Sequence, residues 1–324
     1  MIISLAKIQA PIAKEMKEFE KKFYSSVSTK VILLDTIMEY IIKRKGKQIR
    51  PMFIFLSAGT CGRISESTFH GATLIELLHQ ATLVHDDVVD DANLRRGFFS
   101  LNALWKNKIA VLVGDFLFSR GLLLSLQNKE YDQLELFSMA VKEMSEGELL
   151  QMEKSRGLNI AEADYLKIIK QKTASLFASC CAVGAKSAGA TNEVVEKMKL
   201  FGEHIGMAFQ IKDDLFDYGE TNIGKPLGID IKEKKMTLPL INALSRTTEK
   251  ERRKIIKIVK NESGKGSKIN EVVRFVKESG GLDYATSKMN EYQNMATTIL
   301  NEFPNSEYKN SLNQLVLYCI NRIK

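Results

Sequence analysis

The residues on which many metal and redox sites depend are scarce in this sequence. Its 324 residues include four histidines, and none of them has the HExxH spacing of a zinc protease. The four cysteines form no CxxC pair and no disulfide framework, so free thiols in a reducing compartment are expected. The phosphate-loop motif GxxxxGKS/T and the dinucleotide motif GxGxxG are also missing, which argues against a nucleotide cradle.

Long hydrophobic runs are absent as well. No stretch of 18 apolar residues runs without interruption, so the sequence predicts no transmembrane helix. The N-terminal residues lack the basic segment and the long apolar segment of a secretion signal. A cytoplasmic location is therefore expected.

The sequence is also poor in the signals of β-structure. It has only five prolines, and alternating patterns flanked by hairpin turns are lacking. Apolar residues instead recur at three- and four-residue spacing, as in residues 68–91, where Leu74, Leu78 and Ala81 share one face. Segments 131–153, 162–189, 192–217 and 234–246 follow the same rule. The pattern predicts an all-α protein.

What the sequence does have is an excess of positive charge. Its formal net charge of +8 suits an anionic partner, which could be nucleic acid, a membrane face or a phosphorylated small molecule. A solvated basic surface without a partner is the alternative. Charge alone does not choose among these.

Two acidic clusters share one spacing. The pattern DDxxD occupies residues 86–90 and again residues 213–217, each time at the end of an apolar helical segment. On a helix the first and last aspartates of such a cluster lie on one face, where like charges repel. A cation removes that repulsion, and all-oxygen ligands with open positions suit Mg²⁺. A solvated acidic helix end is the alternative for one cluster, but the repeated spacing favours metal binding.

Basic residues accompany both clusters. Lys47 and Arg50 precede the first cluster, Arg95 and Arg96 follow it, and Gly224-Lys225-Pro226 follows the second. Arginine binds phosphate oxygens through a planar fork and lysine through a point charge. Metal-binding acids together with these cations indicate a diphosphate substrate.

The motifs, taken in order, resemble those of the trans-type polyprenyl diphosphate synthases, most of all the long-chain octaprenyl and heptaprenyl enzymes. The matching segments are GKQIRP, LVHDDVVDDANLRRG, KTASLF, AFQIKDDLFDY and GKPLGIDIKEKKMTLPL, and their order and spacing match from about residue 43 to residue 242. The resemblance implies a single synthase domain over residues 1–324, in which residues 1–40 form N-terminal helices outside the motifs. It implies an all-α, isoprenoid synthase-like bundle of about ten or more helices around a deep central cavity.

The resemblance also implies roles for individual residues. The metal-binding candidates are Asp86, Asp87, Asp90, Asp213, Asp214 and Asp217, with Asp86, Asp90 and Asp213 as direct ligands. The positions that match contacts of the allylic diphosphate are Arg95, Lys172 and Lys225, and those that match contacts of isopentenyl diphosphate are Lys47, Arg50, His79 and Arg96. Thr173 and Gln210 match residues near the reacting carbon, while Asp230 and Lys235 match supporting positions. A core histidine at 79 and a helix-packing amide at 210 are the alternatives.

By the same resemblance, the chain condenses isopentenyl diphosphate head-to-tail with an allylic diphosphate, expected to be farnesyl or geranylgeranyl diphosphate. Three Mg²⁺ ions per active site, for which Mn²⁺ can substitute, assist ionisation of the allylic C–O bond. The departing diphosphate accepts the proton that is lost, so no side-chain base is needed. The expected assembly is a homodimer without nucleic acid.

Product length is the finest expectation from the resemblance. Ala81 and Thr82 occupy the fifth and fourth positions before Asp86, and neither is aromatic, so an open upper tunnel and a long all-trans product are expected. Phe137 could form a floor, or it could simply belong to the core. A shorter-chain farnesyl or geranylgeranyl diphosphate synthase is the alternative.

Three rival functions remain. A terpene cyclase would carry an Asn/Ser/Glu-type second metal motif, and a poorly active subunit of a heterodimeric synthase would carry degraded aspartates, whereas both clusters are intact here. A nucleic-acid or membrane-binding protein would show a continuous basic stripe with interleaved aromatic residues, which is not found. Residues 251–260 are basic and amphipathic, and they are interpreted as a solvated helix face.

Overall fold

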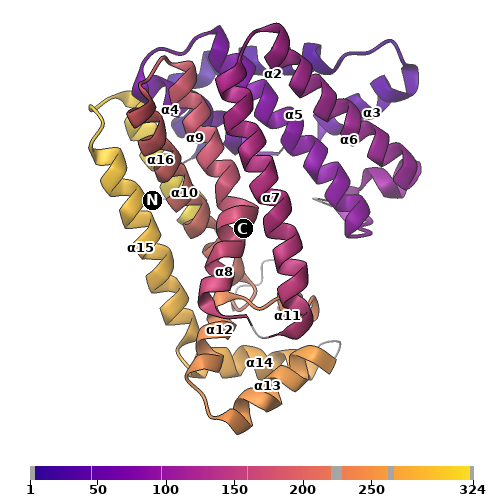
Figure 1. Ribbon diagram of the computed structural model, residues 1–324, viewed down its shortest axis with the longest axis vertical. Helices are drawn as coiled ribbons and strands as arrows, with labels where there is room; N and C mark the ends of the chain where they lie inside the picture. Colours follow the sequence, from indigo (N-terminus) through magenta and orange to yellow (C-terminus); the bar gives the residue numbers. More distant parts are fainter. Residues whose placement is uncertain are drawn as a thin grey trace. The chain divides into compact units, whose positions relative to one another are not determined.

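The computed structural model describes residues 4–44, 46–95, 97–158, 160–219, 228–261 and 266–321. Helices make up nearly all of the regular structure in these ranges, which confirms the predicted all-α class (Figure 1). The N-terminal elements are α1 (Leu5–Gln9), η1 (Ala10–Ile12), α2 (Ala13–Val27), α3 (Ile32–Lys43), α4 (Ile49–Cys61), α5 (Glu66–Val89), β1 (Leu94–Arg95), β2 (Phe98–Phe99) and α6 (Leu101–Gln127). They are followed by α7 (Tyr131–Gly157), α8 (Glu162–Ile169), η2 (Lys170–Ala174), α9 (Ser175–Ser187), α10 (Asn192–Phe216), α11 (Ile229–Lys232), α12 (Leu238–Ser245), α13 (Glu249–Asn261), α14 (Gly266–Glu278), α15 (Gly281–Asn301) and α16 (Glu307–Asn321).

The chain divides into two compact units. Unit 1 comprises Met1–Ser138, Cys180–Met198 and Phe303–Leu312, and unit 2 comprises Met139–Ser179, Lys199–Glu302 and Asn313–Lys324. The divisions fall inside α7, α9, α10 and α16. The single-domain organisation expected from the sequence stays a prediction.

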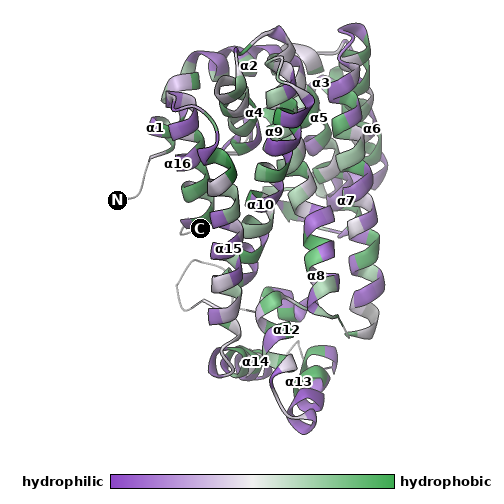
Figure 2. Ribbon diagram, turned by 60° about the vertical axis from the view of Figure 1, so that its left-hand side comes forward, coloured by the Kyte–Doolittle hydropathy of each residue, from purple (hydrophilic) through white to green (hydrophobic). Residues whose placement is uncertain are grey.

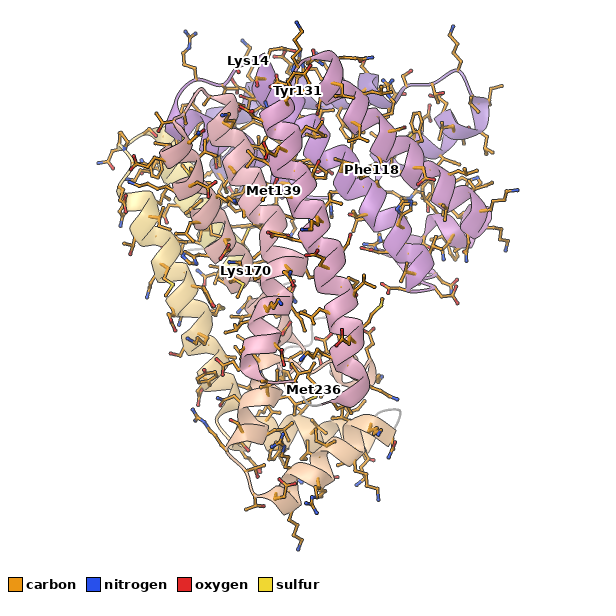
Figure 3. The ribbon with its side chains drawn as sticks, viewed as in Figure 1. Lys14, Phe118, Tyr131, Met139, Lys170 and Met236 are labelled. Atoms are coloured by element: carbon orange, nitrogen blue, oxygen red, sulfur yellow. The ribbon has the colours of Figure 1, made fainter. Side chains whose placement is uncertain are left out.

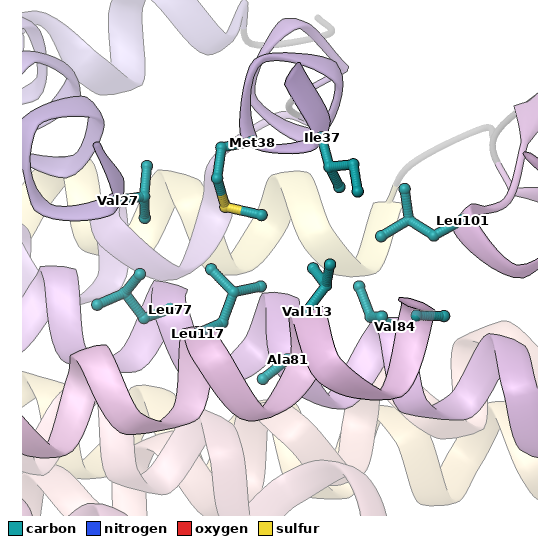
Figure 4. Close-up of a cluster of buried hydrophobic side chains, with 10 residues drawn as sticks. Val27, Ile37, Met38, Leu77, Ala81, Val84, Leu101, Val113 and Leu117 are labelled. Atoms are coloured by element: carbon teal, nitrogen blue, oxygen red, sulfur yellow. The ribbon is translucent and has the colours of Figure 1, made fainter. Parts of the chain in front are cut away.

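Unit 1 is organised around α4 and α5. In α4 every residue from Pro51 to Ala58 is buried, as expected for a helix that is apolar on all sides and lies inside its unit. One side of α5 packs against α6, where Ala81 joins a cluster of buried side chains that includes Leu77, Val113 and Leu117 (Figure 4). This packing fixes the end of α5, from which the first aspartate cluster projects.

Helix α6 of unit 1 is relevant to the prediction that the chain has no transmembrane helix. Helix α6 is long and apolar enough to cross a membrane by length and composition, with a mean hydropathy of 1.8 and a third of that window buried. Asp115 and Arg120 interrupt its apolar residues, which is why a search for unbroken runs passes over it. Length and composition are equally satisfied by a core helix of a soluble protein, so the finding is weak evidence for a span.

Unit 2 contains most of α7, α8, η2, the start of α9, most of α10, helices α11 to α15 and the second part of α16. Helix α12 is buried from Leu238 to Leu244, and the start of α15 approaches it so closely that a side chain at Gly281 would strike the carbonyl of Pro239. Helices α13 and α14 are strongly amphipathic and contact each other. Hydrophobic and hydrophilic residues therefore share each of these two ribbons in Figure 2.

Candidate functional site

The first aspartate cluster lies at the C-terminal end of α5, and its three aspartates differ in solvent exposure. Asp86 and Asp90 are exposed, whereas Asp87 is only 3% exposed. The Nε atom of Arg95 donates to Oδ1 of Asp87 over 2.7 Å, which ties the helix end to the β1–β2 hairpin. Burial raises the pKa of Asp87, and the guanidinium of Arg95 opposes that rise. Two carboxylates therefore face solvent while the one between them is held by an arginine.

The other residues assigned to unit 1 surround helices α4 and α5. Lys47 is exposed just before α4, Arg50 is half-buried in the first turn of α4, and His79 is 7% exposed on α5. Burial raises the pKa of Cys180 to about 12, and Arg50 and Glu76 lie close enough to act on this thiol. Helices α4, α5 and α9 thus meet near Arg50. Arg96 lies outside the described residues.

The second cluster, at the end of α10 in unit 2, repeats the pattern of one buried carboxylate beside more accessible ones. Asp213 and Asp217 are half-buried and Asp214 is 5% exposed. Oδ1 of Asp214 accepts a bond of 2.9 Å from Nε2 of Gln210, and Oδ2 accepts one of 2.8 Å from the Tyr165 hydroxyl. Burial raises the pKa of Asp214 to about 7, although both donors favour its charged form. This carboxylate is therefore a buried hub, by which we mean an acceptor that joins Gln210 of α10 and Tyr165 of α8.

The carboxylate of Asp217 is bonded to the main chain. Its oxygens accept hydrogen bonds from the backbone N–H groups of Ile229 over 2.7 Å and of Asp230 over 3.2 Å. Burial and the nearby carboxylate of Asp230 raise the pKa of Asp217. Nζ of Lys235 lies 3.6 Å from Oδ1 of Asp230, so this lysine joins the same group. Lys225 lies outside the described residues.

Lys172 and Thr173 occupy a π-helical turn, η2, between α8 and α9. Such turns interrupt α-helices mostly at functional sites, because the extra residue turns side chains toward a common point. Nζ of Lys172 lies 2.5 Å from Oε2 of Glu148 and 3.0 Å from Oε1 of Gln151, both on α7. The Thr173 hydroxyl donates to Oε1 of Gln210 over 2.8 Å. A continuous hydrogen-bonded row thus runs from η2 to the second aspartate cluster.

Helix α7 reaches this turn because residue 147 is a glycine. A Cβ atom there would lie 2.8 Å from the Cβ atom of Gln171 and 2.8 Å from the backbone nitrogen of Lys172. Both distances are below ordinary contact, so any side chain would push α7 away from η2. Gly147 therefore brings Glu148 and Gln151 within reach of the lysine.

A pocket of unit 2 collects these groups. It encloses about 590 Å³ of space, partly open to solvent, and six of the residues predicted from the sequence line it: Lys172, Thr173, Gln210, Asp214, Asp230 and Lys235. Ile160, Ile168, Ile169 and Met236 supply apolar wall, and Met236 is labelled in Figure 3. The pocket combines cations, carboxylates and a hydrophobic wall, as a site for an apolar molecule with an anionic head would require.

Sequence reasoning missed several residues of this pocket. Tyr165 and Gln151 line it, and Glu148 contacts its lysine, yet none of the three lies in a motif from which a role could be inferred. The sequence offered one indirect signal, because Tyr165 lies in an apolar helical segment and its side chain could be expected to be buried. The structure shows that it is buried, and a buried tyrosine hydroxyl needs a hydrogen-bond partner.

The three residues assigned to chain length lie in unit 1, and two of them are buried. Ala81 is 1% exposed within the cluster shared by α3, α5 and α6, and Phe137 is 2% exposed on α7. Thr82 is half-buried, and its hydroxyl donates to the carbonyl of His79 over 2.9 Å. These positions fit either a tunnel wall or plain core, so their role stays a prediction.

The donors present fit a hard divalent cation bound jointly with substrate. Within the described ranges, histidine, cysteine and acidic side chains nowhere gather in a group of three or more that could hold a metal by themselves. Mg²⁺ does not require such a cage, because it commonly takes one or two carboxylates and completes its shell with water and phosphate oxygens. Asp86 and Asp90, one turn apart and exposed, offer that kind of partial site.

Comparison with known proteins agrees with this chemistry. Residues 31–276 match the family model described as polyprenyl synthetase. The chain is 36% identical over 320 residues to an all-trans-nonaprenyl-diphosphate synthase (geranyl-diphosphate specific) of Rhodobacter capsulatus, with 98% of each chain covered. It is 31% identical over 290 residues to a geranylgeranyl diphosphate synthase of Saccharolobus solfataricus, covering 86% of this chain and 87% of that one.

Solved structures show the same fold. A decaprenyl diphosphate synthase of Rhodobacter capsulatus superimposes with a TM-score of 0.93 at 30% identity, covering 99% of this chain and 100% of that one. A polyprenyl synthase of Caulobacter crescentus, solved with calcium and isoprenyl diphosphate, has a TM-score of 0.90 at 31% identity, with 99% of each chain covered. The all-α bundle expected from the sequence is thereby confirmed.

Proposed function

Because the chain belongs to the polyprenyl synthetase family, a family of prenyltransferases, we propose that it condenses isopentenyl diphosphate with an allylic diphosphate. The allylic C–O bond breaks, a carbon–carbon bond forms head-to-tail, and diphosphate and a proton are released. One observation carries this proposal. A single pocket of unit 2 gathers six of the residues to which the resemblance assigned a metal, substrate or supporting role, although they are spread over 64 positions of the sequence, from residue 172 to residue 235.

In this proposal some of the aspartates bind metal and others hold the motifs in position. Asp86, Asp90 and Asp213 hold Mg²⁺, because Asp86 and Asp90 are exposed and Asp213 is half-buried. Bound Mg²⁺ supplies the positive charge that stabilises the leaving diphosphate. Asp87 and Asp214 are hydrogen-bonded inside the protein and keep their motifs in position. A count of three ions, and their replacement by Mn²⁺, belong to the proposal.

The basic residues bind the anionic heads of the two substrates. Lys172 is held by Glu148 and Gln151 on α7 and lines an apolar-walled pocket, where it binds the allylic diphosphate. Lys47 and Arg50 in unit 1 bind isopentenyl diphosphate, and Lys235 supports the second cluster through Asp230. Thr173 and Gln210, held to each other, orient the allylic carbon. The isoleucines give the pocket an apolar wall, which limits the access of water to the allylic carbon once substrate fills the pocket.

We propose a long-chain, all-trans product made from a farnesyl or geranylgeranyl primer. The nonaprenyl relative and the decaprenyl structure support a long product, and Ala81 is a small residue at the position where the resemblance would place a blocking aromatic in a short-chain enzyme. The similarity to a geranylgeranyl diphosphate synthase supports a shorter product as the second candidate.

A homodimer in the cytoplasm is part of the proposal. Helix α6 presents large apolar side chains to solvent, with Leu112 59% and Leu126 50% exposed, which is unfavourable for a monomer in water. A second copy packed on α6 would cover them.

The decisive test is a product analysis. Purified protein is incubated with Mg²⁺, labelled isopentenyl diphosphate and, in separate reactions, geranyl, farnesyl or geranylgeranyl diphosphate, and the products are sized by chromatography. We expect ladders that end at a long-chain product of about six to eight isoprene units or more, and a stop at four units would select the shorter-chain enzyme. Activity that survives EDTA would contradict the metal assignment.

Two substitutions separate the aspartate roles. Asp86→Ala removes a proposed ligand and is expected to lower kcat/KM by about 100-fold or more. Asp283→Ala, at an exposed aspartate in the first turn of α15 and outside both motifs, is the matched control and is expected to change it little. Equal effects of the two changes would show that general negative charge, rather than a defined ligand, matters here.

A further inference from the structure

The outer side of α13 carries a row of cations. Six of the 13 residues of this helix are lysine or arginine and two are glutamate, a net charge of +4, half of the formal charge of the whole chain. Five of them fall within about 120° of the helix circumference, along a stripe about 15 Å long. These five, here called the α13 stripe, are Lys250, Arg253, Lys254, Lys257 and Lys260, and all are exposed.

The apolar side of α13 is already buried within the protein. Ile255, Ile258 and Val259 are at most 3% exposed, and α13 contacts α14, whose Val272 and Val276 are fully buried. The stripe is therefore not the polar side of a helix that could roll over and insert. Any partner of this surface must be bound by charge.

Acidic neighbours offset the stripe only in part. Arg253 contacts Glu249 over 2.9 Å, and Lys254 contacts Glu271 over 2.9 Å and Glu251 over 3.4 Å. Surface pairs of this kind contribute little, and α13 keeps its net charge of +4 when its own two glutamates are counted. Five cations at spacings of three, four and seven residues repel one another, and a polyanionic surface would relieve that repulsion.

We propose that the α13 stripe docks the protein on an anionic lipid surface. The inference rests on the proposed function, because a long-chain polyprenyl diphosphate is an amphiphile that leaves water for a bilayer. Nucleic acid is the less favoured polyanion: α13 has no aromatic residue that could stack on a base, and its cations form one straight row. The interaction is peripheral and electrostatic, without insertion.

The expected strength follows from the charge count. Each lysine or arginine near an anionic leaflet adds about 1 kcal/mol, which is about fivefold in the partition coefficient. Reversing three of the cations should therefore weaken binding by at least roughly 100-fold. The attraction should also fall steeply with salt, because the Debye length shrinks from about 10 Å at 0.1 M to about 3 Å at 1 M.

The test is flotation of the full-length protein with vesicles of phosphatidylcholine alone or with one quarter phosphatidylglycerol, at 0.1 M and 1 M KCl. We expect binding only to the anionic vesicles at low salt. The variant Lys250→Glu/Lys257→Glu/Lys260→Glu should lose it. The matched control Lys7→Glu/Lys14→Glu/Lys17→Glu changes the net charge equally at exposed positions of α1 and α2 and should retain it.

Several results would overturn the inference: no flotation with anionic vesicles, equal losses in the two triple variants, or tighter binding to duplex DNA than to vesicles at the same salt. Circular dichroism checks the fold of each variant, and the salt dependence of the unaltered protein provides a measurement that needs no variant. Prenyl transfer assayed without vesicles should be unchanged in the α13 variant. A protein that floats but lacks activity would refute the proposed function and leave the surface assignment standing.

Discussion

The hydrogen bond from Tyr165 to Asp214 allows a sharp test of the buried hub. Tyr165→Phe keeps the ring and removes only the hydroxyl that donates to Oδ2 over 2.8 Å. Asp214 then retains Gln210 as its other side-chain donor, over 2.9 Å. Losing a donor to a buried charged acceptor costs about 1.5–3 kcal/mol, whereas losing one to a neutral group costs about 1 kcal/mol.

The cost must therefore depend on pH. Burial raises the pKa of Asp214 to about 7, so the folded protein binds this proton more tightly than the unfolded chain does. Protonation of Asp214 thus stabilises the fold fully below about pH 4, and that stability is lost as the pH rises to about 7. Above pH 7 the carboxylate is charged and needs its donors most.

The assay is urea unfolding of metal-free protein in EDTA at pH 5.5 and pH 8.5. We expect Tyr165→Phe to lower the free energy of unfolding by about 2 kcal/mol at pH 8.5 and by about 1 kcal/mol or less at pH 5.5. Tyr131→Phe, at a tyrosine that is 58% exposed and labelled in Figure 3, is the control and should cost little at either pH. A cost that is equal at the two pH values would refute the assignment of Asp214 as a buried carboxylate that titrates near neutrality.

Three further predictions concern close packing. Gly147→Ala should push α7 from the backbone of Lys172 and lower kcat/KM for the allylic diphosphate by up to about 100-fold, measured by steady-state kinetics, with the far-ultraviolet circular dichroism unchanged. The added methyl group of Gly114→Ala should collide with the ring of His85 and destabilise the protein by about 1–3 kcal/mol in thermal unfolding. It should also raise the Mg²⁺ concentration needed for half-maximal activity. The second substitution His85→Ala should recover most of the lost stability. Ala81→Phe should shorten the product seen by chromatography, and an unchanged product length would refute the open tunnel.

The helical class was predictable because it is encoded in local patterns, and the aspartate motifs were visible as repeated local spacings whose role stays a prediction. Apolar residues at three- and four-residue spacing identify α5 and α10 directly, and the DDxxD clusters stand at the ends of those helices. The gathering of Lys172, Gln210 and Asp230 in one pocket, in contrast, was available only through resemblance to a family, since spacing along the chain says nothing about distances between helices.

Other features could not be predicted because they depend on tertiary contacts. The π-helical turn at residues 170–174 has no distinctive composition, and it forms where α7 and α10 both press on it. The pairing of Tyr165 with Asp214 joins residues 49 positions apart in sequence. The exposed apolar side of α6 was missed for a different reason, since charged residues interrupt a pattern that remains apolar on average.

The two aspartate motifs share one local arrangement. In each of them the second aspartate is nearly inaccessible and is hydrogen-bonded, Asp87 to an arginine on the following hairpin and Asp214 to a tyrosine on α8. A helix end that presents exposed like charges would fray by repulsion, because each carboxylate destabilises its neighbour one turn away. A buried and bonded carboxylate between them ties that end to another element. In the proposed metal site, the spacing DDxxD therefore combines the ligands with their own anchor.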